Sequence, residues 1–168
     1  MEINSFRGQY AFLSNFFAAK TMFEGMEYPT AEHAFQAAKA LPVDKIIVFD
    51  QEVSTRAFIR DFASPTDAKR YGKTVKIRED WSKIRDSVMF IVLMSKFSDP
   101  QLKAALLGTG DAQLVEGNWW HDCYWGACEC PRCSERPKVN RLGQLLILVR
   151  AIYAHGMEND VHLTINPV

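Results

Sequence analysis

The sequence lacks several features that would place it in a broad functional class. It carries no net charge, because 20 basic residues balance 20 acidic ones. This balance argues against nonspecific binding to nucleic acid, which needs a large positive field, but not against an enzyme that acts on one modified nucleotide. The sequence also has no apolar run long enough to cross a bilayer, since the most apolar stretch, 88–94, is far too short.

Targeting signals, internal repeats, low-complexity segments and domain linkers are also missing. The N-terminus has no basic region followed by an apolar one, so we find no signal peptide. With 168 residues, 48% of them apolar, the chain is long enough to bury a core. We therefore expect a cytoplasmic protein that forms a single domain over residues 1–168 and does not contact a membrane.

Hydrophobic periodicity predicts a mostly α, multihelical domain with a small β element. Capping residues, prolines and glycines delimit the helices, which we expect at 31–40, once or twice within 44–62, and at 65–71, 81–97, 100–108 and 140–155. Extended segments are expected at 10–13, in a hairpin of 20–23 with 26–28, within 111–117 and at 161–165.

The segment 28–39 carries the most informative polar pattern. Thr30 is the expected N-cap of its helix. Glu32, Gln36 and Lys39 follow at i, i+4 and i+7 and therefore share one stripe of the helix. If the stripe is buried, a low dielectric shifts the pKa values of its charged groups, as an active site requires. If it faces solvent, the same residues form an ordinary pair of opposite charges.

The loop 118–126 concentrates aromatic side chains. Trp119, Trp120 and Trp125, together with Tyr124, offer flat surfaces on which a nucleobase or sugar ring could stack. Asp122 lies among them and is a candidate acid, base or electrostatic stabiliser. The alternative is that the aromatic rings fill a small core from a loop. For the set as a whole we favour a functional role.

The start of the last predicted helix contains a second candidate binding feature. Asn140 is predicted to cap this helix with its side chain. Gly143 lies in the first turn, where free amides and the positive end of the helix dipole could bind an anion. The two roles are compatible.

All four cysteines lie between Cys123 and Cys133, with His121 beside them. A disulfide framework would spread cysteines along the chain, so we expect reduced thiols. The Cys-x2-Cys end of the cluster is typical of zinc sites, although its Cys-x-Cys step is tighter than usual. We predict a structural zinc held by Cys123, Cys128, Cys130 and Cys133. Free thiols in a flexible loop, or a redox role, are the alternatives.

Taken in order, several motifs resemble the NADAR family, named for NAD and ADP-ribose metabolism, which includes the YbiA-like N-glycosidases. The motifs are Leu13-Ser14-Asn15-Phe16; Tyr28-Pro29-Thr30-x-Glu32-His33-x-Phe35-Gln36-x-x-Lys39; Asp80-Trp81; Thr109-Gly110 before Leu114-Val115-Glu116; Asp122-x-x-Trp125-Gly126; and Asn140-x-Leu142-Gly143 with Leu145-Leu146 and Arg150. The resemblance covers nearly the whole chain. It departs from the family pattern in a Cys-rich insert within 123–138, which resembles a metal-holding subset of the family.

The resemblance implies a YbiA-like fold and a hydrolase that cleaves an N-glycosidic bond on ribose without a catalytic cofactor. Two substrate classes are associated with the family: intermediates of riboflavin synthesis, and ADP-ribose attached to guanine in DNA or RNA. The second class also implies a toxin partner, through toxin–antitoxin pairs. We favour ADP-ribosylated guanine, because the aromatic loop could stack a second base. The competing class is a non-catalytic module that binds ADP-ribose or NAD.

Breaking a ribose C–N bond builds positive charge at the anomeric carbon, and Glu32 and Asp122 are the carboxylates we assign to it. Alternatively the sugar opens and Lys39 forms a Schiff base, which requires a desolvated lysine. The closeness of Glu32 opposes the necessary fall in the pKa of Lys39, so direct hydrolysis and the Schiff-base route both stay open. We expect the catalytic residues to converge on one pocket with the substrate-binding residues Asn15, Gln36, Trp81, Trp119, Trp120, Trp125, Gly126, Asn140 and Gly143.

Overall fold

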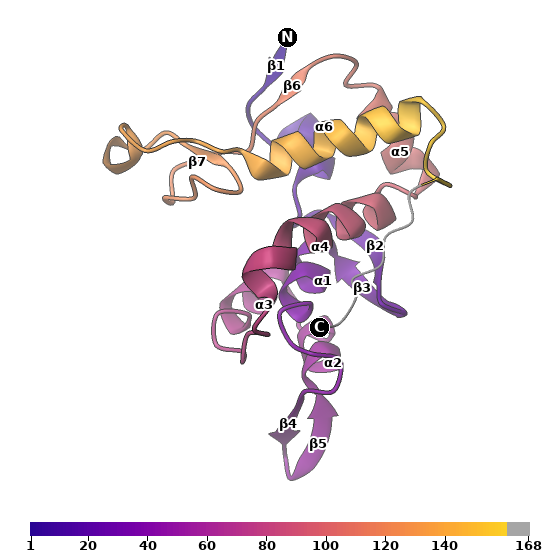
Figure 1. The fold of residues 1–168 in the computed structure, drawn as a ribbon, viewed down its shortest axis with the longest axis vertical. Coiled ribbons are helices and arrows are strands. Elements are labelled where there is room, and N and C mark those ends of the chain that lie inside the picture. The colour runs from indigo at the N-terminus through magenta and orange to yellow at the C-terminus, as the bar shows by residue number, and fades with distance from the viewer. Residues whose placement is uncertain (161–168) are drawn as a thin grey trace. The chain divides into compact units, whose positions relative to one another are not determined.

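The structure is a computed structural model that describes residues 1–160 (Figure 1). The predicted strand at 161–165 lies outside the described residues. Within them the chain forms two compact units: unit 1 comprises 1–14 and 97–160, and unit 2 comprises 15–96. The extent of a single domain over 1–168 stays a prediction.

Unit 2 begins with the predicted hairpin, which is confirmed. Strands β2 (Ala18–Phe23) and β3 (Met26–Thr30) pair antiparallel, with Thr21 opposite Tyr28. The connecting residues Glu24 and Gly25 have φ values of 45° and 79°, a turn conformation in which glycine has no steric cost.

Helix α1 (Ala31–Ala37) follows directly, with Thr30 as its N-cap as predicted. All seven residues of α1 are buried, because β2, β3 and the three other helices of unit 2 pack around it. These helices are α2 (Thr55–Arg60), α3 (Pro65–Tyr71) and α4 (Trp81–Lys96). Helix α1 ends earlier than predicted, so Lys39 lies in the tight turn that follows it and donates its amide to the carbonyl of Gln36 at 3.3 Å.

The prediction of helix across 44–62 is wrong in its first half. Strands β4 (Lys45–Val48) and β5 (Gln51–Ser54) form a second hairpin there, which extends beyond α2 in Figure 1. The β-branched run Ile46-Ile47-Val48 favours a strand, and Phe49 and Asp50 turn the chain with φ values of 49° and 60°. Short apolar runs do not distinguish strand from helix by periodicity.

Unit 1 holds the remaining elements. Strand β1 (Glu2–Ile3) pairs in parallel with β6 (Gln113–Leu114), which lies within the predicted strand. Helices α5 (Pro100–Leu107) and α6 (Arg141–Ala154) pack together, close to their predicted positions. Between β6 and α6 lie β7 (Gly117–Asn118), β8 (Ala127–Cys128) and the 3-10 turn η2 (Pro131–Cys133).

The segment 10–13 is not extended as predicted but belongs to the 3-10 helix η1 (Gly8–Leu13). In this conformation Phe12 packs edge-on against Phe97, with ring centroids 6.5 Å apart, and Leu13 is fully buried. The fold class, mostly α with small β elements, is as predicted. A search of residues 1–160 finds no helix long and apolar enough to cross a membrane.

Candidate active site

The polar residues of α1 are buried and must find partners within the protein. His33, 1% exposed, bonds through Nδ1 to Oγ1 of Thr30 at 2.8 Å and through Nε2 to the carbonyl of Phe62 at 3.1 Å. Burial lowers the pKa of His33, which favours its neutral form. His33 therefore fixes the start of the helix, while the Glu32 stripe lies on another part of its surface.

Glu32 and Gln36 form a buried pair one helical turn apart. Glu32 is 5% exposed and accepts a hydrogen bond from Nε2 of Gln36 at 2.7 Å. Its backbone amide donates to the carbonyl oxygen of Asn15 at 3.0 Å, which places Asn15 beside the start of the stripe. Of the two alternatives left open by the sequence, the structure supports burial for Glu32 and Gln36 and excludes a solvated face.

Two buried acceptor atoms near this pair have no hydrogen-bond partner within residues 1–160. They are Oε1 of Gln36 and Oδ1 of Asn15, whose amide group donates only a weak bond to Sδ of Met89 at 3.4 Å. Buried acceptors without partners are costly and are uncommon away from ligand sites. Unsatisfied buried acceptors of this kind mark the region around Asn15 and Gln36 as a candidate ligand site.

Lys39 extends the stripe into a half-buried position. Its Nζ donates to the carbonyl oxygen of Gly72 at 2.9 Å. Burial lowers the pKa of Lys39; Glu32 opposes this effect, and the like charges of Lys69 and Lys73 add to it. Desolvation is the largest of these causes, so the net shift is downward despite the nearby carboxylate.

Trp81 and the residues before it line the end of α1. The Arg78 guanidinium binds both carboxylate oxygens of Asp80, at 2.6 and 2.9 Å, and the amide of Arg78 donates to the carbonyl of Lys39 at 2.8 Å. Trp81 lies against Phe35 with ring centroids 5.1 Å apart. The start of α4 is thus held against the C-terminal end of α1.

In unit 1, Asp122 shapes the loop in which it lies. Its Oδ1 accepts the amides of Tyr124 at 3.1 Å and Trp125 at 2.8 Å, and its backbone is bracketed by the side chain of Asn118. This turn is typical of aspartate. Asp122 therefore has a structural role in addition to the catalytic role predicted for it.

The tryptophans of this loop differ in exposure. Trp119 and Trp120 are 64% and 52% exposed, so they do not fill a core. Trp125 is half-buried and packs edge-on against Tyr124 at 5.1 Å. The loop therefore leaves the indole rings of Trp119 and Trp120 available for stacking.

The start of α6 differs from the prediction. Asn140 occupies the N-cap position with left-handed dihedrals, but its side chain bonds to the carbonyl of Leu114 at 2.8 Å and the amide of Glu116 at 3.0 Å. The prediction of side-chain capping is therefore wrong. The carbonyls of 123–126 instead accept the amides of 139–142, which would otherwise be free to bind an anion.

Gly143 and Gly126 have packing roles that explain their identity. A Cβ at Gly143 would collide with the carbonyl oxygen of Leu114, and one at Gly126 would collide with that of Glu116. Both glycines let the backbone segments of unit 1 approach closely. A direct role of either in binding substrate stays a prediction.

Unit 2 thus brings together Asn15, Glu32, Gln36 and Lys39 along α1, with Trp81 against Phe35. The other predicted site residues, Asp122, the loop tryptophans, Gly126, Asn140 and Gly143, belong to unit 1. Their convergence with the α1 group stays a prediction. Sequence reasoning missed Gly72 and Arg78, both contacts of Lys39, because only the tertiary fold brings them to α1.

Comparison with known proteins identifies the family. The family described as the NADAR domain matches residues 4–152, and thus parts of both units. The chain belongs to the NADAR family. It is 35% identical to N-glycosidase YbiA of Escherichia coli over 144 residues, which cover 84% of this chain and 80% of that protein. The NMR structure of E. coli YbiA matches 99% of this chain and 94% of its own, with a TM-score of 0.72 and 31% identity.

A second group of relatives carries a different name. The chain is 34% identical to the chloroplastic riboflavin biosynthesis protein PYRR of Zea mays over 133 residues. This match covers 74% of the chain but 19% of the maize protein. The names of the YbiA relatives agree with the N-glycosyl hydrolase class predicted from the sequence.

The family motif at Thr109 and Arg150 has a structural role. The buried guanidinium of Arg150 donates to Oγ1 of Thr109 at 2.7 Å, and that hydroxyl donates to the carbonyl of Leu106 at 2.6 Å. The pair joins the end of α5 to α6. Not every motif residue of the resemblance therefore belongs to the site.

Proposed function

We propose that this chain hydrolyses the N-glycosidic bond between a ribose and an exocyclic amine, and that α1 carries the reaction. The observation that carries the proposal is the desolvated Lys39 beside the buried Glu32–Gln36 pair. A module that only binds its ligand has no need for a lysine with a lowered pKa. The names of the YbiA relatives support the same reaction class.

The lowered pKa of Lys39 favours the imine route. In this route the ribose ring opens, and the neutral amine of Lys39 adds to C1. The C1–N bond to the base then breaks, and the base leaves as its free amine after taking up a proton. Water finally hydrolyses the imine, which releases the sugar and restores the amine of Lys39.

Direct hydrolysis assigns different roles to the same residues. A carboxylate stabilises the positive charge at C1, and water attacks without a covalent intermediate. Glu32 is the carboxylate for this role in unit 2, and Asp122 is the second predicted carboxylate. The two routes differ in one observable, a covalent bond to Lys39.

For the substrate we propose ADP-ribose attached to guanine. The exposed rings of Trp119 and Trp120 support this choice, because ADP-ribosyl guanine offers two bases for stacking. The second candidate is a phosphoribosylamino-pyrimidine of riboflavin synthesis, which the names of the plant and Vibrio vulnificus relatives favour.

Incubation of the protein with each substrate, followed by mass spectrometry of the products, tests the proposal. We expect release of guanine or its nucleic acid together with ADP-ribose, at a higher kcat/KM than release of the pyrimidine. A higher kcat/KM on the pyrimidine would reverse the choice of substrate. Tight binding of ADP-ribose without any release of base would overturn the enzymatic function itself.

A further inference from the structure

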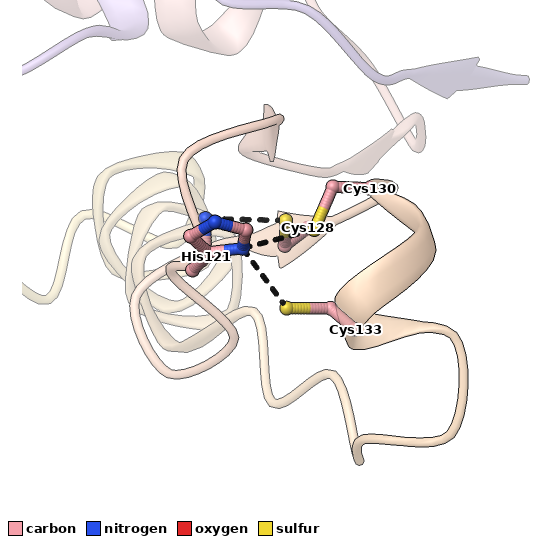
Figure 2. A group of neighbouring side chains, drawn as sticks. All are labelled: His121, Cys128, Cys130 and Cys133. Atoms are coloured by element: carbon pink, nitrogen blue, oxygen red, sulfur yellow. Dashed lines mark hydrogen bonds between the residues drawn. The ribbon is translucent and has the colours of Figure 1, made fainter.

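We propose that His121, Cys128, Cys130 and Cys133 bind one structural zinc ion, through Nδ1 of the histidine and three thiolate sulfurs. The ligand atoms of these residues all lie within 4.8 Å of one another (Figure 2). Nδ1 of His121 is 3.0 Å from Sγ of Cys130 and 3.7 Å from Sγ of Cys133. The proposal does not depend on the proposed function.

These separations fit a tetrahedral metal site. Zn–S bonds of about 2.3 Å and Zn–N bonds of about 2.0–2.1 Å place ligand atoms about 3.5–3.8 Å apart around the ion. The distances from Nδ1 to the two sulfurs bracket the lower part of this range. The ligand atoms farthest apart, within 4.8 Å of one another, would close by up to about 1 Å around the ion.

The burial of the cysteines supports the same conclusion. Cys128 and Cys133 are 0% exposed and Cys130 is 6% exposed, and the three form a small cluster against which Cys123 packs. All four are free thiols. The segment around them contains only the short elements β8 and η2, so its interior consists of thiols where a small domain would place aliphatic side chains. Small domains of this kind commonly replace a core with a metal.

The backbone conformation of His121 directs both its backbone amide and its Nδ1 towards the cluster. Its φ of 69° is unusual for a residue with a side chain. In this conformation the amide donates to Sγ of Cys128 at 3.3 Å while the imidazole points at the other two sulfurs (Figure 2). An N–H···S bond to a thiolate ligand stabilises the negative charge of its sulfur.

This ligand set differs from the four cysteines predicted from spacing, because His121 replaces Cys123. Cys123 packs against the cluster, while its carbonyl accepts the amide of Val139 at 2.8 Å and ties it to the chain before α6. Three thiolates and one imidazole complete a tetrahedral shell and leave no position for water. The zinc would therefore stabilise the loop and would not generate a nucleophile.

A metal at this site would also restrain the neighbouring residue Asp122. His121 is a ligand and the next residue, Asp122, forms the turn that holds Tyr124 and Trp125. A metal on His121 would fix one end of this turn, and the bonds of 123–126 to the start of α6 fix the other.

Metal analysis of the full chain purified from zinc-supplemented medium tests the proposal. We expect about one zinc per chain, with X-ray absorption giving three sulfurs at about 2.3 Å and one nitrogen at about 2.0–2.1 Å. A protein that stays metal-free after incubation with zinc under reducing conditions would overturn the site. A shell of four sulfurs would overturn the assignment of His121.

Three variants separate the ligands, with affinity measured by competition against a chromophoric chelator. His121→Asn removes the imidazole but tolerates the left-handed backbone, and Cys133→Ser removes a thiolate. Because loss of a hydrogen bond to a metal ligand alone costs about 10–100-fold in metal affinity, we expect each of these two variants to bind zinc at least about 100-fold more weakly. Cys123→Ser is the matched control and should keep one zinc per chain. Loss of zinc in Cys123→Ser with retention in His121→Asn would contradict the proposal, and if Cys133→Ser does not fold, the other two variants decide.

Discussion

Gly72 packs against the side chain of Gln36 so closely that a Cβ at this position would lie 2.8 Å from Cδ of Gln36 and would overlap its Oε1. The carbonyl of Gly72 also accepts the hydrogen bond from Lys39. One glycine at the end of α3 therefore contacts two of the three polar residues of the α1 stripe. Its φ of −60° is open to any residue, so the constraint is the space beside Gln36.

Gly72→Ala should therefore impair catalysis more than stability. The added methyl group must displace Gln36 and with it the hydrogen bond to Glu32, and a shift of about 1 Å at a reacting group costs about 100-fold in rate. We expect kcat/KM to fall by about 10- to 100-fold, while the melting temperature changes little. The control is Gly108→Ala at the corresponding end of α5, where a Cβ would lie 3.3 Å from the nearest atom. Equal activity of the two variants would exclude the positioning role of Gly72.

Lys39 should control the pH dependence of turnover. The imine route needs its neutral amine, so kcat should rise with pH through its lowered pKa and then level off. Lys73→Ala removes a like charge that lowers this pKa. The rise should therefore move to higher pH in that variant, while the plateau is retained. If the pH profile does not shift in Lys73→Ala, Lys39 is not the group whose titration controls kcat.

Borohydride added during turnover should trap the sugar on Lys39 as a stable secondary amine. Mass spectrometry of the digested protein would then find the adduct on the peptide that contains this lysine. Lys39→Ala should show no adduct and should lose at least about 100-fold in kcat. Substantial activity in Lys39→Ala, together with inactive Glu32→Gln, would instead establish direct hydrolysis.

Local signals predicted the parts of the site that lie within one element. Thr30 was enough to predict the cap of the helix, and the spacing of Glu32 and Gln36 predicted their pairing one turn apart, whereas Lys39 lies in the turn after the helix. The turn at Gly25 similarly predicted the hairpin of β2 and β3, which precedes this helix. In each case the residues that matter are close in sequence and act through backbone geometry.

The features that sequence reasoning missed depend on contacts between distant residues. Asn140 has the side chain of an N-cap, but its amide group joins the strand region around Leu114 instead. His121 is an ordinary loop residue until its left-handed backbone turns it onto the cysteines. Gly72 carries no local signal beyond the end of a helix, because the side chain that it must avoid lies 36 residues earlier. Such roles are decided by packing, which periodicity does not encode.

Tyr28 should make the stability of unit 2 sensitive to high pH. The phenol is 1% exposed, and burial raises its pKa to about 12. A group with a raised folded pKa contributes stability that is complete below its unfolded pKa of about 10 and is lost as the pH rises towards 12. Its hydroxyl has no hydrogen-bond partner within residues 1–160.

Tyr28→Phe should remove this alkaline loss of stability. At neutral pH the variant should be as stable as the wild type or more stable by up to about 1 kcal/mol, because an unpaired buried hydroxyl is lost. Urea unfolding at pH 8 and pH 11 measures both effects. A clear loss of stability at pH 8 would mean that the hydroxyl has a partner, such as a bound water.

The last prediction separates the charge of Asp122 from its role in the loop. Asp122→Asn keeps an oxygen that can accept the amides of Tyr124 and Trp125 but removes the negative charge, whereas Asp122→Ala removes both. If the carboxylate stabilises positive charge at C1, both variants should lose at least about 100-fold in kcat. Hydrogen exchange at the two amides should increase only in Asp122→Ala, because only that variant opens the turn. Near-normal activity in Asp122→Asn would show that the residue acts only by shaping the loop, and Glu32 would then remain as the carboxylate of the reaction.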